Sequence, residues 1–160
     1  MKHTFLRTVF VSLLGATLLS LAPSTRAQDE GGCSVASVAG KWGFTTNGMV
    51  VGIGPRDSIG VFTLDGAGKL VNGEATSSLN GVITGETFSG TYTVNPDCTG
   101  TFAFEIFDLS GNKILSGTMN TVFDDNGREL RAIFTSAVLP NGTALGTVIT
   151  AHARRVGTDR

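Results

Sequence analysis

Turn signals recur at an even interval along this chain, and this regularity limits the folds that are open to it. After a first signal at Asn47-Gly48, runs of Gly, Asn, Asp and Pro return about every 15 residues, enough for one long strand and a tight turn. No segment between them carries a sustained helical stripe with end caps. The later signals lie at 65–68, 80–81, 95–97, 110–112, 124–127 and 140–142. The pattern predicts an all-β domain of long strands with short connections.

The stretch 86–107 shows the strand pattern most clearly. Large apolar residues alternate with Thr and Ser in its first half, which is the period-2 signature of a strand with one face in a core. A turn at 95–97 follows, because Pro fixes φ while Asn and Asp bond their own backbone. The second half alternates in the same way and completes a β-hairpin. The bulky residues of its inward parity are Phe88, Tyr92, Val94, Phe102, Phe104 and Ile106.

We expect eight antiparallel strands. An open meander would leave two hydrogen-bonding edges bare, and closure into an up-and-down β-barrel removes both. A two-sheet β-sandwich is the alternative, and a tight turn at Gly85-Glu86 would raise the count to nine. Glycines inside the strands fit the bends and bulges of a closed barrel. The strands are expected at 41–46, 57–64, 69–78, 82–94, 99–108, 113–123, 128–138 and 143–155, and the glycines are Gly60, Gly85, Gly90, Gly117 and Gly146.

The first 27 residues have the pattern of a secretory signal peptide. Lys2, His3 and Arg7 precede an apolar run over 8–22 that is too short for a membrane span and leads into small residues. We therefore expect cleavage after Ala27, a secreted or periplasmic location, and no membrane span in the mature protein. The remaining chain divides into an N-terminal arm at 28–39, a barrel domain at 40–156 and a C-terminal tail at 157–160.

Two cysteines, Cys33 and Cys98, are the whole complement of the chain. An exported protein meets an oxidising compartment, so a disulfide between them is the default expectation. Neither C-x-x-C spacing nor a neighbouring histidine points to a redox or metal pair. The acidic run at 124–127 lacks the downstream Glu of a calcium loop. The sequence therefore predicts one disulfide, no metal site and no cofactor.

The charge of the mature chain argues against nucleic-acid binding. With Lys2, Arg7 and Arg26 removed, 9 of the 12 basic residues remain against 13 acidic ones, a net charge of −4. The basic residues are scattered along the chain, apart from Arg154-Arg155. Nucleic-acid partners need a basic patch, and none is indicated.

Candidates for acid–base chemistry are few. His152 is the one histidine left after processing, and its strand position favours the surface. Glu105 has the opposite parity to its aromatic neighbours, which places it outside the barrel unless the faces are reversed. Tyr92 has the inward parity. With these three candidates and no nucleophile elbow, the sequence inclines against an enzyme.

The sequence Gly40-Lys41-Trp42 resembles the G-x-W start of lipocalins and related calycin barrels. In that family the tryptophan caps the closed end of the barrel and packs against a basic residue near the end of the chain. The resemblance implies these roles for Trp42 and for Arg154 or Arg155, as a cation–π contact. The helix that follows the last lipocalin strand is missing, so the chain also resembles the allene oxide cyclase-like barrels. The patterns at 62–69 and 93–101 resemble an uncharacterised family of small secreted bacterial proteins.

These features predict a secreted, lipocalin-like barrel that binds a small apolar molecule. The apolar loop at 48–55 either plugs the barrel mouth, covers the ligand as a lid or extends the second strand. One alternative is a cyclase- or isomerase-type barrel enzyme. Another is an interaction module such as a protease inhibitor, because the chain resembles secreted bacterial metalloprotease inhibitors, which are also small disulfide-bonded barrels that open with G-x-W after a flexible arm. The inserting arm would then be residues 28–39. The expected ligand-binding residues are Trp42, Phe44, Met49, Val51, Ile53, Phe88, Tyr92, Phe102 and Phe104.

Overall fold

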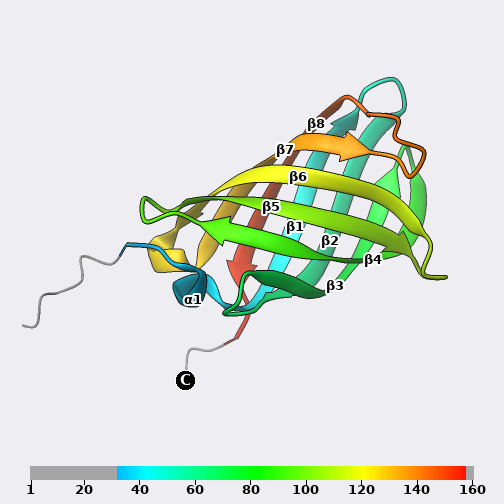
Figure 1. Cartoon of the computed structure of the whole chain (residues 1–160). Helices are drawn as coiled ribbons and strands as arrows, with labels where there is room; N and C mark the ends of the chain where they lie inside the picture. Colours follow the sequence, from blue (N-terminus) through cyan, green and yellow to red (C-terminus); the bar gives the residue numbers. More distant parts are fainter. Residues whose placement is uncertain (1–31, 158–160) are drawn as a thin grey trace, which may run out of the picture. The chain divides into compact units, whose positions relative to one another are not determined.

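Eight antiparallel strands follow one another in chain order around a closed barrel in residues 32–157, the part of the chain that the computed structural model describes (Figure 1). Each strand pairs with the next one, and the last pairs with the first. The predicted eight-stranded barrel is confirmed and the β-sandwich alternative is wrong. The strands are β1 Gly40–Val50, β2 Gly54–Leu64, β3 Lys69–Leu79, β4 Val82–Val94, β5 Thr99–Asp108, β6 Lys113–Asp124, β7 Glu129–Val138 and β8 Thr147–Arg155.

The seam between β1 and β8 closes the barrel. Its ladder runs from Trp42 opposite Arg155 to Val50 opposite Thr147. Each named strand among residues 32–157 therefore has a partner on both sides, which removes most of the pairing surface that an eight-stranded meander would expose. The ladder between β7 and β8 is short and covers only Glu129–Ile133 of β7.

Three of the expected boundaries are wrong, namely the end of β1, the start of β2 and the start of β8. Asn47-Gly48 is not a turn, because both residues stay in the β1–β2 ladder, where the Asn47 side chain donates to the Asp57 carboxylate. Gly48 is required there by a close approach, since a Cβ would lie 2.0 Å from the carbonyl oxygen of Val148. The chain reverses instead at 51–53, and β8 begins four residues later than expected. Gly85-Glu86 does not turn either, so β4 is continuous.

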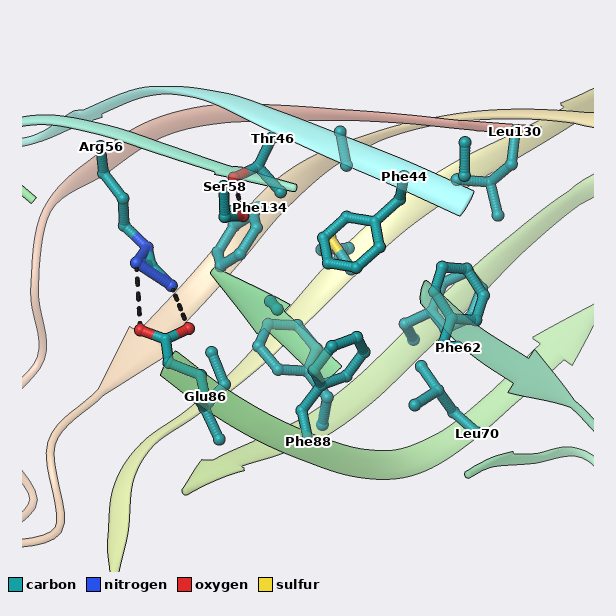
Figure 2. A pocket seen from close by; sticks show the side chains of 17 residues that line it. Phe44, Thr46, Arg56, Ser58, Phe62, Leu70, Glu86, Phe88, Leu130 and Phe134 are labelled. Atoms are coloured by element: carbon teal, nitrogen blue, oxygen red, sulfur yellow. Dashed lines mark hydrogen bonds and ion pairs between the residues drawn. The ribbon is translucent and has the colours of Figure 1, made fainter. Parts of the chain in front are cut away.

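Alternation along the strands sorts side chains between the barrel interior and the surface, and β5 shows it best. Phe102, Phe104 and Ile106 are buried, whereas Ala103 and Glu105 are exposed. The same rule directs inward the aromatic rings of β1, β2 and β4 that Figure 2 shows around one space. The inward parity expected from the sequence is therefore correct for the hairpin.

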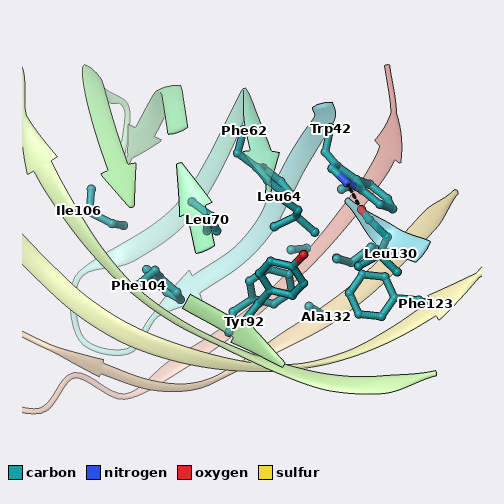
Figure 3. Packing of buried hydrophobic residues seen from close by; sticks show 14 residues of the cluster. Trp42, Phe62, Leu64, Leu70, Tyr92, Phe104, Ile106, Phe123, Leu130 and Ala132 are labelled. Atoms are coloured by element: carbon teal, nitrogen blue, oxygen red, sulfur yellow. Dashed lines mark hydrogen bonds between the residues drawn. The ribbon is translucent and has the colours of Figure 1, made fainter. Parts of the chain in front are cut away.

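One end of the barrel is closed by Trp42 and the segment before it. The Trp42 side chain is fully buried, and its Nε1 donates to the carbonyl oxygen of Val38 at 3.1 Å (Figure 3). The Arg155 guanidinium lies 5.9 Å from the centre of the Trp42 ring, so the expected cation–π contact is made by Arg155. Arg154 points outward, towards Asp125 and Glu129.

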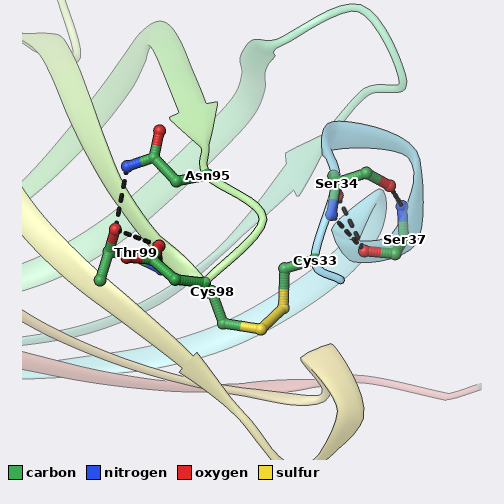
Figure 4. Close-up of a disulfide and its surroundings, with 7 residues drawn as sticks. Cys33, Ser34, Ser37, Asn95, Cys98 and Thr99 are labelled. Carbon is green, nitrogen blue, oxygen red and sulfur yellow. Dashed lines mark hydrogen bonds between the residues drawn. A yellow bond between two sulfur atoms is a disulfide. The ribbon is translucent and has the colours of Figure 1, made fainter. Parts of the chain in front are cut away.

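The predicted disulfide joins Cys33 to Cys98, with 4.8 Å between the two Cα atoms (Figure 4). It fixes α1, a single helical turn over Val35–Val38 that the sequence did not predict. A reciprocal capping box between Ser34 and Ser37 satisfies the first backbone groups of this turn. Four residues are too few to show a helical stripe, which explains why the arm looked irregular.

The predicted signal peptide at 1–27 lies outside the described residues, as do 28–31 of the arm and 158–160 of the tail. Within the described range, no helix has the length and apolar character required to cross a bilayer.

Candidate ligand cavity

A cavity lies inside the barrel, between the aromatic core and the end opposite Trp42. It encloses about 60 Å³, within about 640 Å³ of space when the open solvent at its mouth is included. One water needs roughly 10–15 Å³ on the same measure, so the enclosed part has room for several waters or a small organic group. Six of the seventeen residues that line it are phenylalanines: Phe44, Phe62, Phe88, Phe102, Phe104 and Phe134.

The phenylalanine rings contact one another at their edges. The centroids of Phe44 and Phe88 are 5.4 Å apart at an interplanar angle of 84°, and those of Phe104 and Phe134 are 5.3 Å apart at 72°. Edge-to-face contacts of this kind leave ring faces available to a third group. Because Phe44, Phe88 and Phe134 are only partly buried, the wall is less tightly packed here than at the Trp42 end.

An ion pair interrupts this apolar wall. Arg56 Nη2 lies 2.9 Å from Glu86 Oε2, and Arg56 Nη1 lies 3.4 Å from Glu86 Oε1 (Figure 2). The side chains are 12 % and 7 % exposed, so both charges are largely withdrawn from water. They come from β2 and β4 and meet across β3, whose inward residues here, Ala75 and Ser77, are small.

Hydroxyl groups extend the polar part of the interior beside the ion pair. Thr46 and Ser58, on β1 and β2, share a hydrogen bond of 2.6 Å and both line the cavity. Ser77 stands opposite Ser58 in the β2–β3 ladder and is 1 % exposed. Its Oγ has no hydrogen-bond partner among the described residues. This end of the interior therefore has hydrogen-bonding capacity that the protein itself does not use.

The structure brings together four of the nine expected ligand-binding residues on the cavity wall, Phe44, Phe88, Phe102 and Phe104. Trp42 and Tyr92 are buried beyond the wall, at the closed end. The other three have the outward parity of β1 or lie in the 51–53 turn, and they do not line this cavity. These are Met49, Val51 and Ile53, with 49 %, 59 % and 47 % of their surface exposed.

Sequence reasoning missed Arg56 and Glu86. A parity signal for both was present, because Glu86 has the same parity as Phe88 and Arg56 the same parity as Phe62. Charged residues are seldom buried, and Gly85-Glu86 also matched a turn. Their pairing across β3 depends on the strand register, which the sequence alone does not give.

The acid–base candidates lie away from the cavity. Glu105 is paired with Lys113 on the outer surface at 3.1 Å, and His152 is paired with Glu129 there at 2.7 Å. Tyr92 is buried, but its hydroxyl is directed to backbone carbonyl oxygens at the closed end. Within residues 32–157, no group of three His, Cys, Asp or Glu side chains is arranged to hold a metal ion.

Comparison with known proteins adds one similar fold. No protein-family model matches the chain, and no curated protein matches it either. A solved structure described as EF1p2_mFAP2b bound to DFHBI is similar over 77 % of this chain and 99 % of its own, with a TM-score of 0.53 and 13 % sequence identity. At this identity the likeness concerns the fold, and it agrees with the barrel described above.

Proposed function

We propose that this barrel is a binding protein for a small, mostly apolar molecule, which it holds in the cavity beside Arg56 and Glu86. The observation that carries the proposal is the cavity itself, an aromatic space with few polar groups at one place on its wall. Binding sites for small molecules have this composition, in which apolar surface supplies affinity and a few polar groups fix orientation. Eight-stranded barrels have an interior wide enough for one small ligand.

The size of the enclosed space sets the size of the ligand. About 60 Å³ suits a short alkyl group, because an apolar cavity that binds benzene measures about 150 Å³. A larger molecule requires Phe44 or Phe88 to rotate towards the mouth, and their partial burial supports such a rotation. That a barrel of similar fold is bound to DFHBI supports binding by this architecture in general.

The alternatives have less support in this structure. A cyclase or isomerase needs an acid or base at the substrate. The expected candidates Glu105 and His152 lie on the outer surface, and Glu86, the carboxylate on the cavity wall, is held in an ion pair by Arg56. An inhibitor of the inserting-arm type needs a free arm, whereas Cys33 and Val38 attach residues 33–38 to the barrel. We also propose export, because a structural disulfide is typical of oxidising compartments.

Calorimetric titration with indole, a small neutral aromatic, tests the proposal. We expect saturable binding with a negative heat-capacity change, the signature of apolar surface leaving water. Replacing Ala151 by Leu fills the cavity from β8, and this variant should weaken binding at least tenfold. The matched control is Ala103→Leu on the outward face of β5, which should bind as the wild type does. Absence of binding to the wild type, or equal binding by the two variants, contradicts the proposal.

A further inference from the structure

The ion pair in the cavity wall calls for an explanation other than stability. Withdrawing two charges from water costs several kcal/mol for each ion, and the attraction between them often does no more than offset this. A barrel without a ligand would be served as well by apolar side chains at positions 56 and 86. Arg56 and Glu86 stand instead beside six phenylalanine rings, at the edge of an open space. The position of the pair therefore points to recognition.

The geometry of the pair leaves hydrogen-bonding capacity on both partners. The 2.9 Å contact is a full hydrogen bond, whereas the 3.4 Å contact lies beyond the usual range for N–H···O. A guanidinium group has five N–H donors, and a carboxylate has about four acceptor sites. One charged donor and one charged acceptor therefore stand side by side at the cavity. The Ser77 hydroxyl on the intervening strand is also unpartnered, although Ser77 is not among the residues that line the cavity.

The charges of the pair decide which ligands fit. Arg56 and Glu86 compensate each other, so a neutral ligand can add hydrogen bonds without changing the total charge. An anionic ligand that pairs with Arg56 leaves Glu86 as a buried charge without a partner. A cationic ligand that pairs with Glu86 leaves Arg56 as a buried charge without a partner. Either outcome costs far more than one hydrogen bond returns.

We infer that the Arg56–Glu86 pair makes the cavity selective for neutral ligands that carry a hydrogen-bond donor beside an acceptor at one end, as in a primary amide or a lactam, and an apolar body at the other. The donor of such a group meets the Glu86 carboxylate and its acceptor meets the Arg56 guanidinium, while the body lies among the phenylalanine rings. This inference rests on the proposed function and specifies its ligand class.

Three probes of similar size and different charge test the inference at pH 7. They are 4-ethylbenzamide, 4-ethylbenzoate and 4-ethylbenzylamine, each titrated calorimetrically into the wild-type chain. We expect the neutral amide to bind at least tenfold more tightly than either charged probe. Equal affinities, or tightest binding of a charged probe, overturn the inference while the binding of indole still stands. If neither indole nor any of the three probes binds, the proposed function itself fails.

The variant Glu86→Gln makes the test sharper, because it removes the negative charge and keeps the shape of the side chain. Arg56 is then uncompensated, and 4-ethylbenzoate should bind at least tenfold more tightly than it does to the wild type and overtake the amide. The matched control is Glu105→Gln, the same change at an exposed ion pair, which should leave the order of affinities unchanged. An unchanged order in folded Glu86→Gln contradicts the inference. If this variant does not fold, the wild-type series decides alone.

Discussion

The single tyrosine of the chain shows how one hydroxyl fastens the closed end of the barrel. Tyr92 lies on β4, and its O–H is directed both to the carbonyl oxygen of Val35, at 3.1 Å, and to that of Asp65. One proton is thus shared between α1 and the β2–β3 turn. Burial raises the pKa of Tyr92 to about 12, and the nearby Asp65 carboxylate adds to this effect.

The pKa of Tyr92 provides a direct test of this arrangement. We expect the absorbance of phenolate near 295 nm to rise with a midpoint at about pH 12 in the folded protein, and at about pH 10 in urea. The folded state favours the neutral phenol, so its contribution to stability is complete below pH 10. That contribution is lost as the pH rises through the folded pKa. A midpoint near pH 10 while the protein remains folded contradicts the assigned environment. Tyr92→Phe, which should show no transition, serves as the blank.

For single residues, the position in the strand alternation predicts the inward or outward direction of a side chain better than the residue type does. Phe44, Phe88, Phe102 and Phe104 were expected at the ligand and line the cavity. Met49 was chosen for its apolar character, although its odd position already placed it on the outer face of β1. At Glu86 the residue type predicts an exposed side chain, whereas its position in the strand alternation directs it inward. Alternation along a strand was the more reliable guide in both cases, because the ladder fixes it.

At several points along the strands, the backbones of neighbouring strands come so close that there is no room for a Cβ atom. Gly90 on β4 is such a point, because a Cβ there would stand 2.1 Å from the carbonyl oxygen of Ala103 on β5. Register shifts mark other irregular points, between Val61 and Thr63 of β2 and between Leu70 and Gly73 of β3. These features bend the strands around a narrow barrel.

Replacing Gly90 by Ala should therefore destabilise the protein. The added methyl group must push β5 away, and we expect a loss of about 1–3 kcal/mol in the free energy of unfolding, measured in urea. Gly66, in the turn after β2, is the matched control because nothing lies within 4 Å of a Cβ there. Gly66→Ala should leave stability unchanged or raise it by up to about 1 kcal/mol, since it restricts the unfolded chain. Equal effects at the two positions would exclude a steric role for Gly90.

The elements themselves were largely predictable from turn chemistry. The starts of β3, β4, β5 and β6 match expectation, because Gly and Asx residues mark a chain reversal before each of them. The Asn47-Gly48 signal failed because glycine there serves a close strand contact. Short-range patterns do not distinguish these two uses of glycine. The α1 turn also escaped prediction, since its position depends on a disulfide to a residue 65 positions away.

For the whole molecule, the disulfide is the largest single constraint outside the strand ladders. It joins the segment before β1 to the β4–β5 turn, with a sequence separation of 65 residues. On the chain-entropy model, a loop of this length stabilises the folded state by about 4 kcal/mol. The constraint also retains Val38, which is fully buried against Trp42.

The double variant Cys33→Ser/Cys98→Ser should lower the free energy of unfolding by up to about 4 kcal/mol. The fluorescence of Trp42, the one tryptophan of the chain, reports the transition in urea. Amide exchange in Val35–Val38 should accelerate more than exchange in β5, because a helical turn of four residues does not persist unaided. A reduced wild-type sample should behave as the variant does. An unchanged urea midpoint would mean that the ladders alone hold the arm.

In the described part of the chain, Trp42, Val38 and Arg155 close one end of the barrel, and the cavity lies towards the other end. A ligand that binds as proposed would enter and leave at that end, where Arg56, Phe44 and Phe88 line the cavity. Ligand binding and ligand release then cross the same barrier, and the same few side chains set its height. A substitution that lowers this barrier should accelerate ligand binding and ligand release together. The dissociation constant should stay nearly unchanged.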